Sequence, residues 1–226
     1  MGNGAAAGQR AAGVAGAAAA KAAAQKKSLQ AQEQDTPENQ QRRAAWREAL
    51  SGIDPARLVF LDESGVTTEM TRRYGRAPSG ERLREGTPAG HWNTLTLLGA
   101  LTSQGVLASM TVASPTDGEV FLAYLEEVLC PCLEPGQILI ADNLSAHKVD
   151  GVRECIEATG ATLLYLPPYS PDFNPIEKAW SKIKQQLRKT KARTLDRLEH
   201  AVAQALSTVN SQDAHGWFRH CGYAIY

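Results

Sequence analysis

The sequence predicts an α/β fold in which a mixed, five-stranded sheet is flanked by helices. An antiparallel hairpin comes early in the chain, and strands that alternate with helices follow, which is typical of a sheet with both antiparallel and parallel pairs. The strands are short apolar runs bounded by turn residues. Apolar residues make up 43% and charged residues 21% of the 226 residues, which excludes a wholly disordered chain.

The antiparallel part of the sheet comes first. Residues 58–61 are a buried apolar strand, and we expect a turn at residues 62–65 because Asp, Glu, Ser and Gly follow the strand. A basic, irregular connection over 66–90 leads to strands at 91–101 and 106–112, which the residues Thr-Ser-Gln-Gly join as a hairpin.

The remaining elements alternate between helix and strand. Apolar periodicity, Gly and Pro breaks and helix-start residues predict a helix of roughly a dozen residues from Thr116, a strand at 138–141, a helix at 149–158, a strand at 163–166, a helix from Pro175 and a last helix over about 195–209.

The N-terminal quarter differs in composition. Residues 1–27 form an Ala/Gly-rich, low-complexity tract for which we expect no fixed structure, and residues 28–56 read as a polar linker that ends in a short helix near 42–50. Residues 57–226 are then the predicted domain. No apolar run reaches the ~20 residues of a membrane span, and no secretory leader pattern is present. Four cysteines without metal-site spacing favour free thiols in a reducing cytoplasm.

The formal net charge is zero, but the charges are unevenly distributed. Residues 1–32 carry four basic groups and no acidic group, residues 178–197 carry eight basic groups against Asp196 alone, and residues 33–177 are acidic. The local blocks, and not the total charge, therefore indicate possible partners.

Three carboxylates carry the chemical signal. Asp62 and Asp142 each follow a buried strand, at the edge where open α/β sheets place their ligands, and Glu177 lies in the first turn of a helix. Neighbouring carboxylates need a cation, and oxygen ligands favour Mg²⁺ or Mn²⁺. The alternative is structural: Asp is a common turn residue, and Asn174 with Pro175 and Glu177 fits a helix capping box.

The sequence also resembles the transposases of the insertion sequence 630 family, a bacterial branch of the mariner superfamily. Glu177 follows Asp142 by 35 positions, in agreement with that family's spacing. The resemblance runs from about Lys27 to the C-terminus, and the segments that carry it are FLDESG (60–65), RRYGRAP (72–78), DNLSAHK (142–148) and LPPYSPDFNPIEKAWSKIK (166–184).

This resemblance implies a ribonuclease-H-like fold in which Asp62, Asp142 and Glu177 match the catalytic Asp-Asp-Glu triad. It implies that these residues hold two Mg²⁺ or Mn²⁺ ions, which activate a nucleophile and stabilise the leaving oxygen in phosphoryl transfer. The expected reaction is cleavage of transposon-end DNA and strand transfer to target DNA at TA sites, by a dimer on DNA associated with the nucleoid. Glu63 is expected on the opposite face of the strand.

Further residues are candidates for DNA contact or for the rim of the active site. DNA phosphates are the expected partners of the basic helix after Glu177 and of a second basic cluster, although a charge run is also typical of a solvated helix face. Asn143 and His147 are expected at the active-site rim, and the alternative for His147 is a structural role. The candidate DNA-binding residues are Lys178, Lys182, Lys184, Arg188, Arg72, Arg73 and Arg76.

No helix-turn-helix module is recognisable in residues 1–56, although full-length members of this family carry one. A separately encoded helix-turn-helix half is therefore an expected partner. Two alternatives to an active transposase domain stay open: a catalytically impaired or split-frame remnant that binds DNA without sequence preference, and another nuclease of the same fold.

Overall fold

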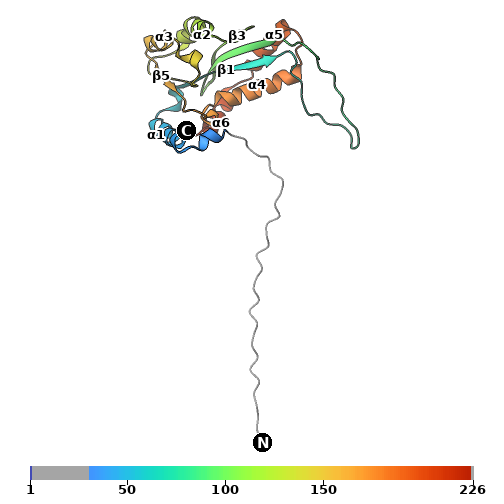
Figure 1. Cartoon of the computed structure of the whole chain (residues 1–226), viewed down its shortest axis with the longest axis horizontal. Helices are drawn as coiled ribbons and strands as arrows, with labels where there is room; N and C mark the ends of the chain where they lie inside the picture. Colours follow the sequence, from blue (N-terminus) through green and yellow to red (C-terminus); the bar gives the residue numbers. More distant parts are fainter. Residues whose placement is uncertain (2–30, 225–226) are drawn as a thin grey trace. The chain divides into compact units, whose positions relative to one another are not determined.

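A computed structural model describes Met1 and residues 31–224, so the low-complexity tract predicted for residues 1–27 lies, apart from Met1, outside the described residues. The predicted mixed sheet of five strands is confirmed, with the strand order β3-β2-β1-β4-β5 (Figure 1). Its strands are β1 (Leu58–Thr67), β2 (Thr94–Thr102), β3 (Gly105–Val112), β4 (Ile138–Ala141) and β5 (Thr162–Tyr165).

The central strand β1 is longer than predicted. It pairs in parallel with β4 only as far as Leu61, opposite Ala141, but it continues to Thr67 through antiparallel pairing with β2. The expected turn at residues 62–65 is therefore wrong, because the backbone hydrogen bonds of β2 outweigh the turn preference of Asp, Ser and Gly. Asp62 still lies where β4 ends beside β1.

Helices cover both faces of the sheet (Figure 1). Side chains alternate along β1, so that Phe60 faces one hydrophobic cluster and Leu61 the other. The Phe60 face is covered by α4 (Ile176–Thr190), α5 (Leu195–Leu206) and α6 (Ser211–His220), and the Leu61 face by α2 (Gly118–Tyr124), its π-helical extension η3 (Leu125–Leu129) and α3 (Val152–Ala158).

The predicted helices after the hairpin are confirmed with shifted ends, but α6 was not predicted, because Asp213, His215 and Gly216 obscure its apolar period. Asn210 caps this helix by accepting the backbone N–H of Asp213. Short 3₁₀ turns complete the described chain: η1 (Gln32–Asp35), η2 (Pro55–Arg57), η4 (Cys130–Cys132), η5 (Ser145–Lys148) and η6 (Pro171–Phe173).

Residues 31–56 do not behave as the predicted linker. Helix α1 (Pro37–Ala49) begins earlier than the predicted helix, with Thr36 as its cap, and the chain from Ala31 onward forms one compact unit. Trp46 of α1 donates a hydrogen bond to the Tyr223 hydroxyl near the C-terminus, at 3.4 Å. The polar composition of this segment conceals an element that packs on the domain.

The long connection between β1 and β2 projects away from the sheet (Figure 1). Arg193, which precedes α5, holds its base by donating to the carbonyls of Thr68 and Met70, at 2.8 and 3.2 Å. All four cysteines are free thiols, as predicted. Within the described residues, no helix is long and apolar enough to cross a membrane.

Candidate active site

Asp62 is the buried centre of the candidate site. It lies on β1, on the face covered by α4, and only 7% of its surface is exposed. Its Oδ1 accepts the backbone N–H of Glu63 at 2.8 Å, and its Oδ2 accepts the Trp180 indole N–H at 3.2 Å and the Asn174 amide at 3.4 Å. The sheet and α4 thus hold both oxygens of one carboxylate in a fixed orientation.

Burial and neighbouring charges shift this carboxylate strongly. Burial, together with the negative charges of Glu177 and Asp142, raises the pKa of Asp62 to about 7. The hydrogen bonds from the Glu63 N–H and Trp180 act in the opposite direction, because they stabilise the ionised form. The three predicted acids are therefore close enough to interact electrostatically, as an acidic cluster that favours a cation.

Trp180 reaches Asp62 because β2 leaves space for its ring. Gly99 lies opposite Asp62 in the antiparallel register, and a Cβ added at Gly99 would approach the indole Cη2 of Trp180 to 2.6 Å. Trp180 packs α4 on the sheet, and its hydrogen bond to Asp62 was not predicted from the sequence. The glycine inside a strand was the available signal for a close approach.

Asn174 does not cap α4 as predicted. Its side-chain amide points to Asp62, its Oδ1 is buried without a hydrogen-bond partner, and the N-terminus of α4 has no side-chain cap. Pro175 sets the start of the helix instead. Glu177 lies in the first turn, is exposed, and accepts no capping hydrogen bond in the described structure. The capping-box alternative for Glu177 is therefore wrong.

Asp142 follows β4 directly and is half-buried at the site. Its Oδ1 accepts the backbone N–H of Leu144 at 3.1 Å and lies 2.6 Å from Nδ1 of His147. The ring nitrogens of His147 make no well-aligned hydrogen bond, so this contact is chiefly electrostatic. Burial lowers the pKa of His147, but the close contact with the negatively charged Asp142 carboxylate outweighs burial, and the net shift is upward.

His147 is not a rim residue, because only 1% of its surface is exposed and its ring stacks on Phe121 at 4.3 Å. Hydrophobic packing against α2 pulls η5 inward, which the polar sequence around His147 did not indicate. Asn143 is exposed beside Asp142, where a rim residue is expected. Glu63 faces the other side of β1, as predicted, and its charge helps to raise the pKa of His147.

The oxygen donors suit a hard divalent cation, but they are not closed into a cage. In the described part of the chain, no group of three or more His, Cys, Asp or Glu side chains is arranged to hold a metal ion. Mutual repulsion of Asp62, Asp142 and Glu177 and the His147–Asp142 contact account for this open arrangement. The chemistry of the donors and the raised pKa of Asp62 fit a cation that draws the three together.

The basic residues of α4 divide between two sides of the helix. Lys184 and Arg188 follow Glu177 by 7 and 11 positions, a spacing that places all three on one stripe of an α-helix. Lys182 faces α6 instead, where its ammonium pairs with Asp213 and donates to the Thr208 carbonyl. Lys178 lies one helical turn before Lys182 on the same side of α4, and its charge lowers the pKa of Cys221 at the end of α6.

The second basic cluster meets the far end of α4. Arg72, Arg73 and Arg76 lie on the long connection after β1 and share a groove of about 620 Å³ with Lys189 and Lys191. Glu85 lies in the same groove and pairs with Lys191. Basic residues from two segments thus come together, which neither segment alone indicated.

Known proteins resemble this chain in sequence and in fold. The family model described as "DDE superfamily endonuclease" matches residues 57–199. This range includes all three predicted catalytic acids. A search of curated protein sequences gives no match.

Solved structures of Mos1 transposase share the fold. The "Mos1 transposase paired-end complex with left transposon end" superposes with a TM-score of 0.73 at 15% identity, over 89% of this chain and 64% of that chain. The "Mos1 mariner paired end complex with Mn" superposes with a TM-score of 0.70 at 15% identity, over 88% of this chain and 63% of that chain. The "catalytic domain of Mos1 mariner transposase" superposes with a TM-score of 0.59 at 13% identity, over 80% of this chain and 83% of that chain. The chain thus spans less than two thirds of the length of the proteins in the first two structures. The similarity of fold confirms the predicted ribonuclease-H-like fold.

Proposed function

The chain belongs to the DDE superfamily endonuclease family, and we propose that it is the catalytic domain of a DNA transposase of the insertion sequence 630 family. The observation that carries this proposal is the buried Asp62 carboxylate, whose pKa of about 7 reflects burial and the charges of Glu177 and Asp142. Three carboxylates that repel one another in this way are costly to keep together, and a bound cation would offset that cost. The proposed reactions are metal-dependent cleavage of transposon-end DNA and strand transfer to TA sites.

Asp62, Asp142 and Glu177 would hold two Mg²⁺ or Mn²⁺ ions. When bound, such ions supply activation of the attacking oxygen and stabilisation of the leaving oxygen in phosphoryl transfer. The protein supplies orientation: Trp180 and the Glu63 N–H fix the Asp62 oxygens, and burial on the sheet keeps water from that side. With a pKa near 7, Asp62 loses its proton readily when positive charge arrives.

The geometry of α4 indicates how DNA passes the site. At 1.5 Å of rise per residue, Lys184 and Arg188 lie about 10 and about 16 Å along the helix from Glu177, on the same stripe. The groove with Arg72, Arg73 and Arg76 continues at the far end. One strand of duplex DNA carries a phosphate every ~3.4 Å of helix axis, so a duplex lying along α4 would place roughly five base pairs between Glu177 and Arg188.

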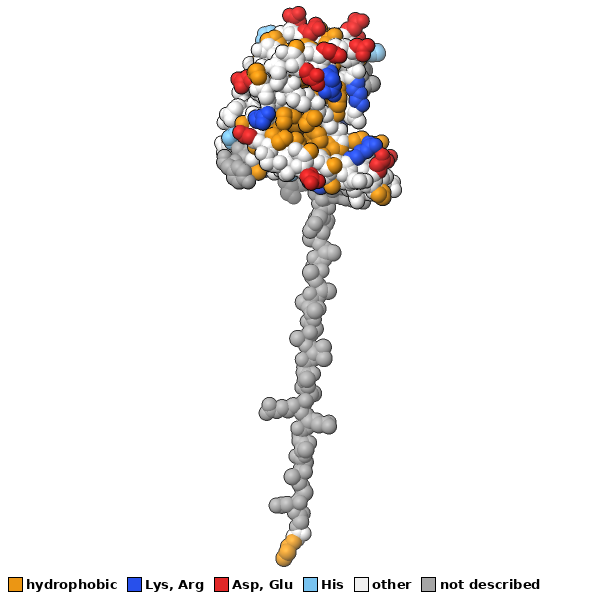
Figure 2. Space-filling model, turned by 90° about the vertical axis from the view of Figure 1, so that its left-hand side faces the viewer, with side chains coloured by type: hydrophobic (Ala, Val, Ile, Leu, Met, Phe, Trp, Pro, Cys, Tyr) orange, Lys and Arg blue, Asp and Glu red, His pale blue; other side chains and the backbone are white. Residues whose placement is uncertain are grey.

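This path revises the expected phosphate contacts. Lys182 is paired with Asp213 of α6, and Lys178 shares its side of α4, so we assign the contacts to Lys184, Arg188 and the groove residues. The face of the molecule shown in Figure 2 differs from this proposed DNA path, because its basic side chains are scattered among acidic ones around a hydrophobic centre. A track on which basic side chains outnumber acidic ones suits a polyanion better than that mixed surface does.

Recognition of the transposon ends and assembly on DNA need more than this one catalytic domain. This chain corresponds to about 64% of the length of the Mos1 chain in the paired-end complex. We propose that end recognition comes from a separately encoded helix-turn-helix half, that two copies of the chain act together on DNA, and that they act on the nucleoid in the cytoplasm. An impaired remnant or a different nuclease of this fold would lack strand transfer.

The test is nicking of supercoiled plasmid DNA by the full chain in Mn²⁺, Mg²⁺ or EDTA. Wild type should nick only with metal, and Asp142→Asn should lose that activity while its thermal unfolding stays unchanged. Glu127→Gln, which alters an exposed acid on the opposite face, is the matched control and should nick normally. Equal nicking by wild type and Asp142→Asn would contradict the proposed site.

A further inference from the structure

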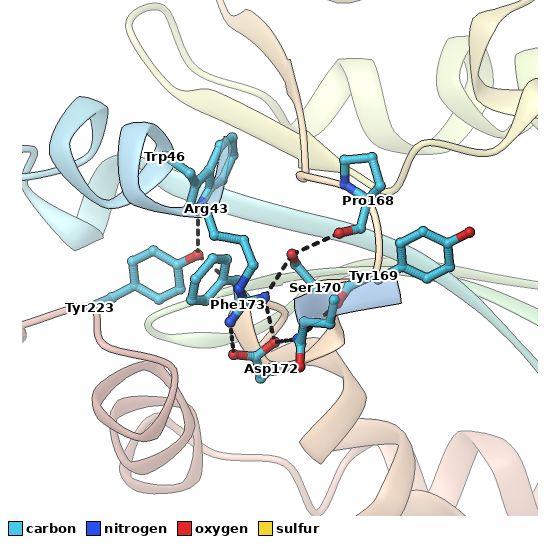
Figure 3. A network of polar contacts seen from close by, with 9 residues as sticks. Arg43, Trp46, Pro168, Tyr169, Ser170, Asp172, Phe173 and Tyr223 are labelled. Atoms are coloured by element: carbon cyan, nitrogen blue, oxygen red, sulfur yellow. Dashed lines mark hydrogen bonds and ion pairs between the residues drawn. The ribbon is translucent and has the colours of Figure 1, made fainter. Parts of the chain in front are cut away.

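The segment 169–173, which leads into Asn174 and Glu177, is held by side chains from α1. Arg43 donates to both carboxylate oxygens of Asp172, at 2.6 and 2.9 Å, and to the Ser170 hydroxyl at 2.7 Å. Figure 3 shows the Arg43 side chain reaching from α1 to these two residues. Arg43 is itself buried, so this two-pronged contact is shielded from water on its helix side.

A second side chain of the N-terminal segment holds the same loop. Gln34 of η1 donates to the Tyr169 carbonyl at 2.8 Å and to Asp172 at 3.1 Å. Tyr169 has a left-handed backbone, with φ of 54°, which is unfavourable for a residue with a side chain. Its ring points away from the network in Figure 3, so its backbone is what Gln34 holds. Such a conformation persists only where the surroundings enforce it.

Phe173, the last residue of the loop, is fixed from two directions. The guanidinium groups of Arg43 and Arg47 lie over its ring, 4.1 and 4.8 Å from the ring centre. Its carbonyl accepts the Tyr223 hydroxyl at 2.7 Å. The next residue, Asn174, donates to Asp62.

These contacts matter because α4 has no side-chain cap of its own. The place of Glu177, in the first turn of α4, therefore depends on how the preceding loop is held as well as on the packing of α4 against the sheet. The residues that hold it, in segments 32–47 and at Tyr223, all lie outside the range 57–199 that the family model matches. The catalytic unit is thus larger than that matched range.

We propose that Arg43 is a positioning residue: through Asp172 and Ser170 it sets Asn174 and Glu177 against Asp62, so that the three acids can share cations. This inference rests on the proposed function for its effect on cleavage. Its effect on the loop itself does not depend on that function. Arg43 touches neither the acids nor the DNA path, and it acts only through the loop.

The experiment compares Arg43→Met with Arg42→Met. Arg42 is the neighbouring residue, exposed on the same helix and paired with Glu38 one turn away, so it is a matched control for charge and helix content. Arg43→Met should weaken Mn²⁺ binding by calorimetry, and lower the maximal rate of plasmid nicking, by roughly tenfold or more with unchanged KM for DNA. Arg43→Lys should restore part of both. Arg42→Met should match wild type.

Amide hydrogen exchange provides a readout independent of activity. In Arg43→Met, residues 169–177 should exchange faster while β1 and β4 keep their protection. Asp172→Asn, at a half-exposed position, should reproduce the effect if the Arg43 variant does not fold. Wild-type protection of 169–177 in a folded Arg43→Met or Asp172→Asn variant would overturn the proposal. If wild type neither nicks DNA nor binds Mn²⁺, the proposed function fails, and exchange still decides whether Arg43 holds the loop.

Discussion

Replacing Asp62 with Asn should remove a loss of stability that the metal-free wild-type protein suffers as the pH rises. The free energy of unfolding of the variant, relative to that of wild type, should therefore increase with pH. In the folded protein, burial and the charges of Glu177 and Asp142 raise the pKa of Asp62 from 3.8 to about 7. Between these two values the folded state binds a proton that the unfolded chain does not, so the free energy of unfolding falls as pH increases. Above pH 7 this loss is complete. Asn carries no charge at any pH and escapes the penalty.

The size of the effect follows from the shift. About three pKa units at ~1.4 kcal/mol each correspond to roughly 4 kcal/mol between low pH and pH 8. Roughly 3 kcal/mol of this loss of stability falls between pH 5 and pH 8, because the remainder has already occurred between the unfolded-state pKa and pH 5. The variant also loses one acceptor, toward the Glu63 N–H or Trp180, which costs about 1 kcal/mol at every pH.

Urea unfolding in EDTA at pH 5, 6, 7 and 8 measures the difference directly. The free energy of unfolding of Asp62→Asn minus that of wild type should rise by roughly 3 kcal/mol from pH 5 to pH 8. Glu127→Gln, the exposed control, should show no such trend. A difference that is constant across this pH range would refute the reasoning, because Asp62 would then not be held with a raised pKa.

Three further changes test the site and the DNA path. Glu177→Gln should abolish nicking while the free energy of unfolding changes by less than about 1 kcal/mol, since no cap is lost; normal nicking would remove Glu177 from the site. Gly99→Ala should cost about 1–3 kcal/mol in urea unfolding and reduce nicking, because its Cβ would press on Trp180; a neutral result would show that the indole moves freely. Lys184→Ala should reduce the slope of log K against log salt by about 0.9 in DNA-binding titrations, while Lys182→Ala, already paired with Asp213, should leave it unchanged; equal effects would contradict the assigned path.

Local sequence patterns predicted the sheet and pointed to Asp62 and Asp142, because strands and their ends depend on local polarity; the assignment of the three acids as a triad came from the resemblance to a known family. Leu58–Leu61 and Ile138–Ala141 are apolar runs that end in an Asp, and parallel pairing brings those ends together. The end of β1 was misjudged because its continuation depends on β2, which follows after a long connection.

Residues whose role depends on distant contacts were harder to predict. Asn174 has the sequence position of a helix cap, yet it contacts Asp62, 112 positions away. Lys182 looks like any other basic residue of α4 until α6 places Asp213 beside it. His147 has polar neighbours in sequence but an aromatic neighbour, Phe121, in space. In each case the role of the side chain depends on a tertiary contact that the local sequence does not reveal.

The role of residues 31–56 shows the same limit most clearly. Their polar composition predicts a linker, because few of their side chains are apolar. Arg43 and Gln34 nevertheless stabilise the loop before Glu177 through charge and hydrogen bonds. Polar contacts between segments about 130 positions apart leave no periodic signal in the sequence.

Anomalous scattering from Mn²⁺ in crystals of the full chain would test the central claim most directly. The account predicts Mn²⁺ density in contact with carboxylate oxygens of Asp62, Asp142 and Glu177, with the three acids drawn closer together than in the metal-free chain. Crystals of Glu177→Gln should show weaker density at the same place. Mn²⁺ bound elsewhere, or no density beside Asp62 at millimolar metal, would contradict the assignment of these acids as a metal-dependent catalytic site.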